Sequence, residues 1–174
     1  MDVMDNMEIY SDKSSPFSDS EFAKYCFEHF DTGGPEGVPD GMLTYDEIIE
    51  VTSIDCSGLG IRSLAGMEVF VKLDTLICRG NEISSLPLDG TPMLKYLDCS
   101  GNYITELNVS QTMIRTLFCN PMSGPDGKNL LEYLFIRRGQ EIEYVTKYRD
   151  KADPKRIPDE TEIISVPEVK DESL

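Results

Sequence analysis

The chain has 174 residues, 40% of them hydrophobic, and its 32 acidic and 16 basic side chains give a formal net charge of −16. This length and apolar content predict one packed domain, while the negative charge repels phosphate backbones and disfavours nucleic acid as a partner. No apolar run approaches the ~20 residues of a membrane span, and five cysteines with one histidine and no CxxC pair provide no zinc site made of closely spaced Cys and His pairs.

The N-terminal third predicts an acidic leader followed by two helices. Residues 1–17 carry neither the basic nor the apolar region of a signal peptide, and we expect them to be flexible. A capping-box pattern at residues 18–21 predicts a helix through Phe30. After a loop rich in Gly and Pro, a second capping box at residues 44–47 predicts a short helix. We expect residues 18–50 to form a helical cap for the repeats that follow.

A sequence repeat then begins and predicts the fold. Apolar residues recur at offsets 0, 3, 5, 8, 10 and 13, with Cys at offset 5 and Asn at offset 8 of two copies. The repeated cysteines are Cys56, Cys78, Cys99 and Cys119, and the partial fifth copy comprises Leu131, Leu134 and Ile136. The pattern LxxLxLxxNxL predicts an α/β leucine-rich-repeat solenoid over residues 51–137, with about five coils and a small parallel sheet.

Residues 138–174 follow as a predicted C-terminal cap and polar tail. Two further strands are expected there, at 144–148 and at 162–166.

Alternation along each strand assigns side chains to the two faces of the sheet. We expect the four repeated cysteines to point inward as reduced, unreactive thiols, because burial in apolar surroundings raises a thiol pKa. The amides of Asn81 and Asn102 are expected to satisfy backbone groups where the chain turns.

The outward positions form a predicted concave face, which repeat arrays use for binding. The candidate partner-binding residues are Asp55, Ile77, Arg79, Tyr96, Asp98, Phe118, Tyr133 and Phe135. Aromatic side chains flanked by Arg are typical of protein-binding hot spots. The alternative is that the C-terminal segment covers the last of them. No set of acid, base and nucleophile appears, so we expect a monomeric, non-catalytic module that binds a protein partner.

Three segments of the chain resemble a family of bacterial leucine-rich-repeat proteins common in gut commensals. They are YCFEHFDT…DGMLTYDEIIEVTSIDCSG at 25–58, LDCSGNYITEL at 97–107 and IRRGQEI at 136–142. The resemblance covers about two thirds of the chain and implies a general binding role. It also implies an exported or cell-envelope protein, although a cytoplasmic location stays open because the chain shows no signal peptide.

The resemblance further implies a link to calcium. In this family the segment between the two helices is similar to an EF-hand loop, DxNxDGxIxxxE, whose oxygens bind Ca²⁺. The implied ligands are Asp31, Asp40, Met42 through its carbonyl, and Glu47. Five extra residues separate Asp31 from Asp40, which breaks the spacing of the motif. Two readings follow, a metal-free connector or a calcium-dependent structural or sensor protein that uses the loop Asp31–Glu47.

Overall fold

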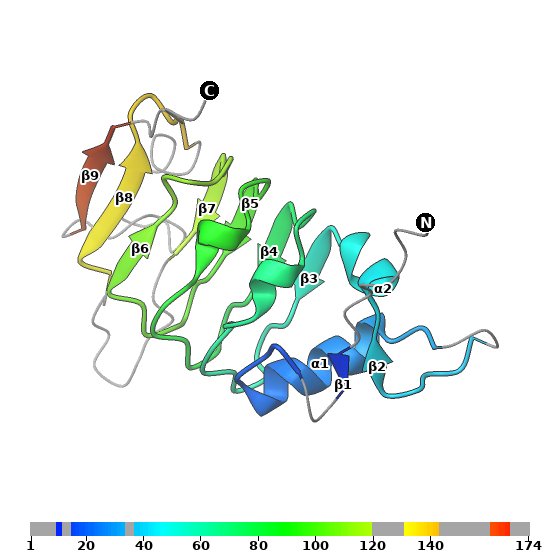
Figure 1. The fold of residues 1–174 in the computed structure, drawn as a ribbon. Coiled ribbons are helices and arrows are strands. Elements are labelled where there is room, and N and C mark those ends of the chain that lie inside the picture. Colours follow the sequence, from blue (N-terminus) through cyan, green and yellow to red (C-terminus); the bar gives the residue numbers. More distant parts are fainter. Residues whose placement is uncertain (1–9, 12–14, 34–36, 120–130, 143–160, 168–174) are drawn as a thin grey trace, which may run out of the picture.

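The computed structural model describes residues 10–11, 15–33, 37–119, 131–142 and 161–167. Figure 1 shows the elements following one another along one axis, from α1 and α2 at one end to β8 and β9 at the other. Each of four successive coils contributes one short strand to the main sheet, and the coils stack side by side. This is the arrangement that the sequence repeat predicts, because one coil cannot bury its apolar edge alone.

Four short elements make up the N-terminal region. They are β1 (Tyr10–Ser11), α1 (Ser20–Phe30), β2 (Met42–Leu43) and α2 (Tyr45–Ile49). β1 pairs with β2 in antiparallel orientation. The capping box predicted for α2 is confirmed, since the Thr44 hydroxyl accepts from the Glu47 backbone and the Glu47 carboxylate accepts from the Thr44 backbone.

The N-cap of α1 differs from the predicted one by one residue. The capping-box pattern makes Ser18 the N-cap, but the structure places Asp19 there. The Asp19 carboxylate accepts hydrogen bonds from the backbone N–H groups of Glu21 and Phe22, at 2.9 and 3.0 Å. Its second oxygen accepts from the Arg62 N–H at 2.8 Å. The hydrogen bond to the first coil therefore favours Asp19 over Ser18 as the N-cap. The sequence around the helix start cannot predict this bond, because its donor is 43 residues away.

The predicted leader extends too far, because Phe17 belongs to the core. Its side chain is 6% exposed, lies 5.0 Å from the Phe22 ring and stacks on Phe70 at 5.9 Å. The backbone of Pro16 also packs closely against Gly66 of the first coil. A Cβ added at Gly66 would lie 2.5 Å from the Pro16 carbonyl oxygen. In the sequence, residues 1–17 look flexible because most of them are polar. Burial of the Phe17 ring against Phe70 of the first coil nevertheless fixes the end of this segment.

The main sheet is parallel and has the order β3-β4-β5-β7. Its strands are β3 (Ser53–Asp55), β4 (Thr75–Ile77), β5 (Tyr96–Asp98) and β7 (Thr116–Phe118). The register aligns the central apolar residue of each strand with its neighbours, and all four of these residues are fully buried. The 3-10 helices η1 (Met67–Val69) and η2 (Leu88–Gly90) lie in the return segments of two coils.

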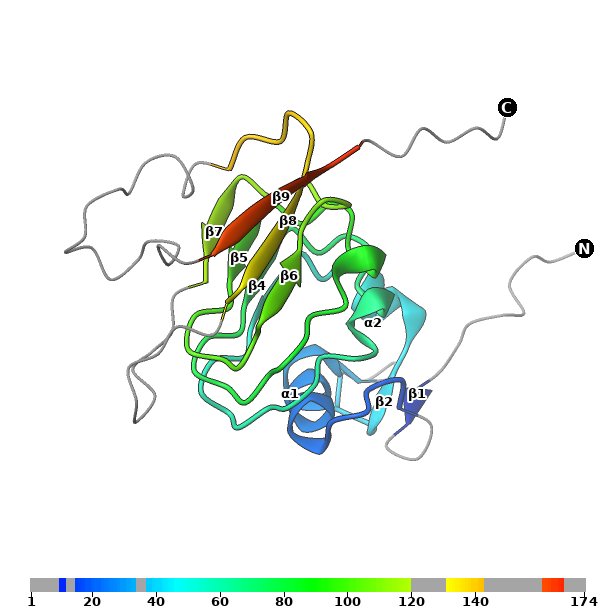
Figure 2. The ribbon, with the colours of Figure 1, turned by 90° about the vertical axis from the view of Figure 1, so that its left-hand side faces the viewer.

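A second parallel sheet ends the described fold and corrects the predicted fifth coil. It has the order β6-β8-β9, with β6 (Glu106–Asn108), β8 (Tyr133–Arg137) and β9 (Glu162–Val166). Leu134 pairs with Leu107 of β6, whereas the repeat predicted that it would stack on β7. β6 lies in the return segment of the coil that contains β5. Because β6 is extended, its open edge offers backbone groups with which β8 can form hydrogen bonds. Figure 2 shows this sheet facing the viewer at the C-terminal end.

The expected strand at 162–166 is confirmed as β9, and the one expected at 144–148 lies outside the described residues. None of the helices in the described ranges is long and apolar enough to cross a membrane.

The two repeated asparagines satisfy backbone groups at the turns, as predicted, and they also join successive coils. Asn81 is 5% exposed, and its Oδ1 accepts from the N–H groups of Leu59 and Ile61 at 3.0 and 3.1 Å. Its Nδ2 donates to the carbonyls of Cys56 and Cys78, both at 2.9 Å. Asn102 repeats the arrangement one coil later. Each amide therefore satisfies backbone groups that a tight buried turn would leave unpaired.

Candidate binding face

The parallel register places one outward residue of each main-sheet strand in a continuous column. Asp55 lies beside Ile77, Ile77 beside Asp98, and Asp98 beside Phe118. Asp55 is exposed and the other three are half-buried, while the residues on either side of each in the chain pack inward. The sequence predicted these four positions as neighbours, and the structure brings them together. We call this column and its flanking residues Arg79 and Tyr96 the concave face.

Acidic and apolar side chains alternate along the column of the concave face. The rings of Tyr96 and Phe118 lie 5.6 Å apart at 41°, and Phe118 also packs against the core. Burial raises the pKa of Tyr96, the negative charge of Asp98 raises it further, and the positive charge of Arg79 partly offsets both.

The two carboxylates of the concave face are each anchored by one oxygen. Asp55 Oδ1 accepts from the Ser57 N–H at 3.2 Å and from the Ser57 hydroxyl at 2.6 Å. Asp98 Oδ1 accepts from the Ser100 N–H at 3.1 Å. Among the described residues, no donor reaches Oδ2 of either side chain, so both can accept from a partner.

Two of the predicted partner-binding residues lie elsewhere. Tyr133 and Phe135 were expected to extend the concave face beyond β7, but they belong to β8 and pair with Glu106 and Asn108 of β6. Their rings are 6.5 Å apart and both side chains are half-buried. The concave face therefore ends at Phe118 within the described residues. The switch of β8 to the other sheet is the physical reason.

A hollow of about 400 Å³ adjoins the N-terminal end of the concave face. It lies between α1 and the first coil and is lined in part by Glu21, Glu28 and Asp55. The Tyr25 and His29 rings stack at 4.1 Å beside it, and Lys24 pairs with Glu28 at 3.9 Å. The carboxylates of Glu21 and Glu28 therefore lie close to Asp55, the acidic residue at this end of the concave face.

The cysteines are buried and free, as predicted. The four repeated cysteines and Cys26 all lie in the core, and none forms a disulfide. Burial raises the pKa of Cys56 to about 12 and that of Cys119 to about 12, and it raises those of Cys26, Cys78 and Cys99 well above their ordinary range. A thiol that stays protonated is a poor nucleophile and a poor metal ligand.

Two of the four predicted calcium ligands lie together, Asp31 at the C-cap of α1 and Glu47 in the first turn of α2. Asp31 Oδ1 and Glu47 Oε1 both accept from the Gly33 N–H, at 3.0 and 3.1 Å. Asp31 Oδ2 accepts from the Gly41 N–H at 2.7 Å, and Glu47 Oε2 accepts from the Thr44 N–H at 2.8 Å. All four carboxylate oxygens thus face hydrogen-bond donors of the chain.

Of the other two predicted ligands, Met42 lies in β2, where it pairs with Ser11 of β1. Asp40 is exposed, and its Oδ1 accepts from the N–H of Met42. Within the described ranges, no three His, Cys, Asp or Glu side chains converge as a metal site. The hydrogen bonds from Thr44 and Thr32 lower the pKa of Glu47, although burial by itself would raise it.

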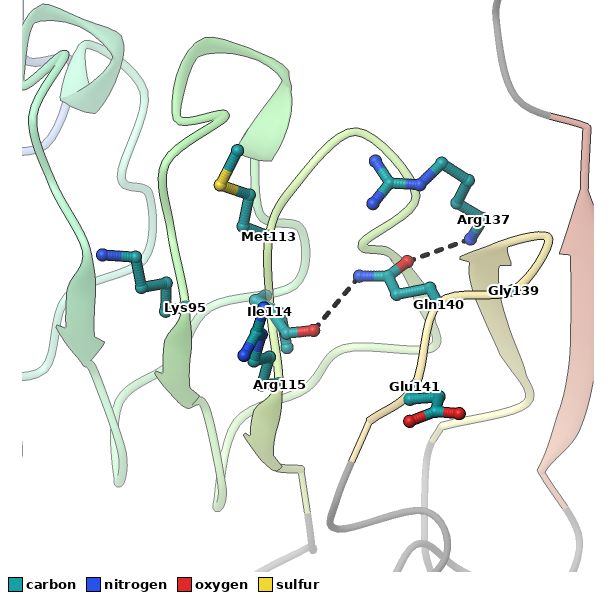
Figure 3. Close-up of a pocket in the computed structure, with 8 residues that line it drawn as sticks. All are labelled: Lys95, Met113, Ile114, Arg115, Arg137, Gly139, Gln140 and Glu141. Carbon is teal, nitrogen blue, oxygen red and sulfur yellow. Dashed lines mark hydrogen bonds between the residues drawn. The ribbon is translucent and has the colours of Figure 1, made fainter.

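A groove that sequence reasoning did not indicate opens beside the concave face. Its volume is about 680 Å³, and it lies between the segment preceding β7 and the turn after β8. Its lining includes Lys95, Met113, Arg115, Arg137 and Gln140. Figure 3 shows Gln140 between the two sides, where its amide donates to the Ile114 carbonyl at 3.3 Å and accepts from the Arg137 N–H at 3.0 Å. The sequence gives no signal for the groove, because β8 reaches this position only through the second sheet.

Comparison with known proteins adds distant likenesses only. No family model matches the chain, and no curated protein matches it. Among solved structures, an internalin C2 from Listeria monocytogenes is 22% identical with a TM-score of 0.48, covering 69% of this chain and 55% of that one. An internalin InlF from the same species is 20% identical with a TM-score of 0.47, covering 70% and 44%. The functional domain of InlJ from Listeria monocytogenes, which includes a cysteine ladder, is 19% identical with a TM-score of 0.32, covering 75% and 38%.

This chain therefore spans between 38% and 55% of the length of those three proteins. Such low identities and TM-scores carry no argument about function. The repeat fold of this chain rests on its own sequence period and its own strand register.

Proposed function

We propose that the chain is a non-catalytic protein-interaction module whose concave face binds a partner. The observation that carries the proposal is the column of Asp55, Ile77, Asp98 and Phe118, which the parallel register makes continuous. A rigid parallel sheet holds these side chains in place, so little ordering is required when a partner binds. The face also combines aromatic residues with an arginine, and both residue types are enriched at protein interfaces.

The charges of the face suggest the chemistry of the partner. Asp55 and Asp98 each keep one oxygen without a donor from the described residues, and the adjoining hollow adds Glu21 and Glu28. The whole chain has a net charge of −16, which attracts a cationic surface at long range. We propose a protein partner that presents basic side chains around an apolar one, with Tyr96 and Ile77 receiving the apolar group.

The non-catalytic part of the proposal rests on the chemistry of the candidate nucleophiles. The raised pKa values of Cys56 and Cys119 keep these thiols protonated at neutral pH. His29 is exposed on α1, and its Nδ1 lies 2.8 Å from the Tyr25 carbonyl oxygen. No thiolate therefore stands ready for attack. An exported or envelope location and a monomeric state stay predictions from the sequence.

The test is an affinity capture with wild-type protein and two face variants, Ile77→Asp and Tyr96→Ala, followed by identification of the bound proteins. Val71→Asp is the matched control, because Val71 is 46% exposed and lies outside the concave face. We expect the face variants to lose partners that wild type and the control retain. Circular dichroism of each variant shows that it is folded. Equal capture by all four proteins would refute the proposal.

The second candidate is a calcium-dependent structural or sensor protein that uses the loop Asp31–Glu47. The supporting observation is that Asp31 and Glu47 share the Gly33 N–H, so two carboxylates lie close together between two helices. Ca²⁺ would have to replace the N–H donors that these oxygens now accept from, since it requires 6–8 oxygen ligands. Calorimetric titration with CaCl₂, together with melting curves with and without chelator, tests this role. Absence of both heat and a shift in melting temperature removes it.

A further inference from the structure

The groove of about 680 Å³ carries positive charge on a strongly acidic protein. Lys95, Arg115 and Arg137 line it, and Glu141 is the one acidic residue among the described residues of its lining. The Lys95 amine pairs with Asp74 at 3.6 Å. Neither Arg115 nor Arg137 forms an ion pair within the part of the chain that the structure describes. Two guanidinium groups are therefore available to a ligand, and each can hold a carboxylate in bidentate fashion.

The register explains why the positive charge gathers at this end. The residue before each main-sheet strand occupies the same edge, and successive coils hydrogen-bond there through the backbone, from Arg115 to Lys95 and from Lys95 to Asp74. The edge changes along the chain from Thr52 and Asp74 in the first two coils to Lys95 and Arg115 in the next two. Arg137 joins them from the end of β8. This edge of the sheet is therefore neutral to negative in the first two coils and positive in the next two.

Apolar surface accompanies the cations. Met93 and Met113 occupy equivalent positions of successive coils, and they are 45% and 53% exposed. Met113 lines the groove together with Ile114, whose carbonyl is held by Gln140. Figure 3 shows Met113 above Ile114 and Glu141 at the lower end of the groove. An exposed thioether next to a guanidinium suits a ligand that is both anionic and apolar, because methionine adapts its shape to an apolar side chain.

We propose that this groove is a second docking site, distinct from the concave face, for a short acidic peptide segment of a partner protein. Arg115 and Arg137 bind its carboxylates, and Met113 packs against an apolar side chain between them. A nucleic acid or an anionic membrane extends far beyond the groove and meets the repulsion of a −16 chain. A short segment meets only the local positive charge, because repulsion beyond about 8 Å is screened at physiological salt.

The test is fluorescence anisotropy with a labelled, end-blocked peptide, Glu-Leu-Glu-Leu-Glu, and its neutral counterpart, Gln-Leu-Gln-Leu-Gln. We expect saturable binding of the acidic peptide only, with affinity that falls as NaCl is raised. Arg115→Glu and Arg137→Glu should each weaken binding about ten-fold or more, which corresponds to about 1.4 kcal/mol. Met113→Ala should weaken it several-fold, but should leave binding of Glu-Ala-Glu-Ala-Glu unchanged.

The matched control is Arg79→Glu, which makes the same charge change on the concave face. It should bind the acidic peptide as wild type does, and Ile77→Asp should do the same. The proposal is overturned if the neutral peptide binds equally, if Arg79→Glu matters as much as the groove variants, or if no acidic peptide binds. Competition by millimolar phosphate with no effect of Met113→Ala would indicate a small-anion site instead. Binding to phosphatidylserine vesicles in preference to the peptide would also overturn it.

Discussion

Asn81 joins two coils through a single buried side chain. Its amide contacts four backbone groups, those of Cys56, Leu59 and Ile61 in the first coil and that of Cys78 in the second. Water cannot reach this position, because the side chain is 5% exposed. A buried backbone group without a partner costs about 1–3 kcal/mol, whereas a satisfied one contributes little. The asparagine positions of the repeat are thus set by the backbone that they satisfy.

We predict that Asn81→Ala lowers the free energy of unfolding by about 3 kcal/mol, because it strands several buried backbone groups. Urea denaturation followed by circular dichroism measures the change. Asn108→Ala is the control, since Asn108 is exposed and, among the described residues, its side chain accepts from Ser110 alone. The control should cost less than about 1 kcal/mol. Similar losses in the two variants would contradict the role given to Asn81.

The buried cysteines lead to a prediction about reactivity. With the pKa of Cys56 and Cys119 raised to about 12, the thiolate fraction at pH 8 is very small. We expect Ellman's reagent to label the native protein far more slowly than it labels a free thiol, and to label it rapidly in denaturing urea. Rapid labelling of the native protein at pH 8 would show that at least one of these cysteines is accessible as a thiolate.

At the level of elements, α1 is fixed to the solenoid by its own N-cap. Asp19 accepts from Glu21 and Phe22 at the start of the helix and from Arg62 in the first coil. Burial by itself would raise the pKa of Asp19, but these N–H donors outweigh it and lower the pKa below its ordinary 3.8. One side chain thus begins a helix and also attaches it to the repeat.

We predict that Asp19→Ala lowers the free energy of unfolding by about 1–2 kcal/mol, as expected for a lost N-cap. Because the folded-state pKa is lowered, this stabilisation is fully present above pH 3.8 and is lost as pH falls through the lower pKa of the folded state. The difference between wild type and variant should therefore shrink in acid. Ser18→Ala is the control, since Ser18 is exposed and, within the described part of the chain, its hydroxyl bonds to that of Ser63 alone. A larger effect of Ser18→Ala would restore the predicted capping box.

The second sheet shows how an element can change its neighbours. β8 carries the apolar pattern of a fifth coil, yet it pairs with β6. The turn after β8 is then fixed by Gln140, whose Nε2 lies 3.2 Å from the Val109 carbonyl and 3.4 Å from that of Thr112. Gln140 therefore ties the turn after β8 to the segment between β6 and β7, much as Asn81 joins two coils.

On the scale of the whole molecule, charge is the dominant property. A net charge of −16 on 174 residues repels itself in the folded state, where the charges are closest together. The four ion pairs of the described residues are all at the surface, and such pairs contribute little stability. Screening by salt should then stabilise the fold, since it weakens the repulsion more than it weakens those few pairs.

We predict that raising NaCl from 10 to 500 mM increases the melting temperature by about 2–4 °C, which corresponds to about 1 kcal/mol. Differential scanning calorimetry in the presence of chelator measures it. CaCl₂ at matched ionic strength is the comparison, because an extra rise above that of NaCl would indicate specific calcium binding and favour the second candidate function. A fall in melting temperature with NaCl would show that the surface ion pairs outweigh the repulsion.

Several features follow from the sequence without any structure. The period of 20–22 residues predicts stacked coils, and alternation predicts which side of each strand faces the core, so the burial of Cys78 and the place of Ile77 were both predictable. The capping box at Thr44 was predictable because all its contacts lie within four residues. Local periodicity and local hydrogen bonds carry this information, and both are written in neighbouring positions of the chain.

The tertiary structure alone decided which distant segments meet. It buried Phe17, made Asp19 rather than Ser18 the N-cap, and paired β8 with β6, which separated Phe135 from the concave face. The groove with Arg115 and Arg137 exists only because of that last pairing. In each case the deciding energy is a hydrogen bond or apolar contact between segments more than 20 residues apart, and no local pattern encodes which of several open edges such a segment will fill.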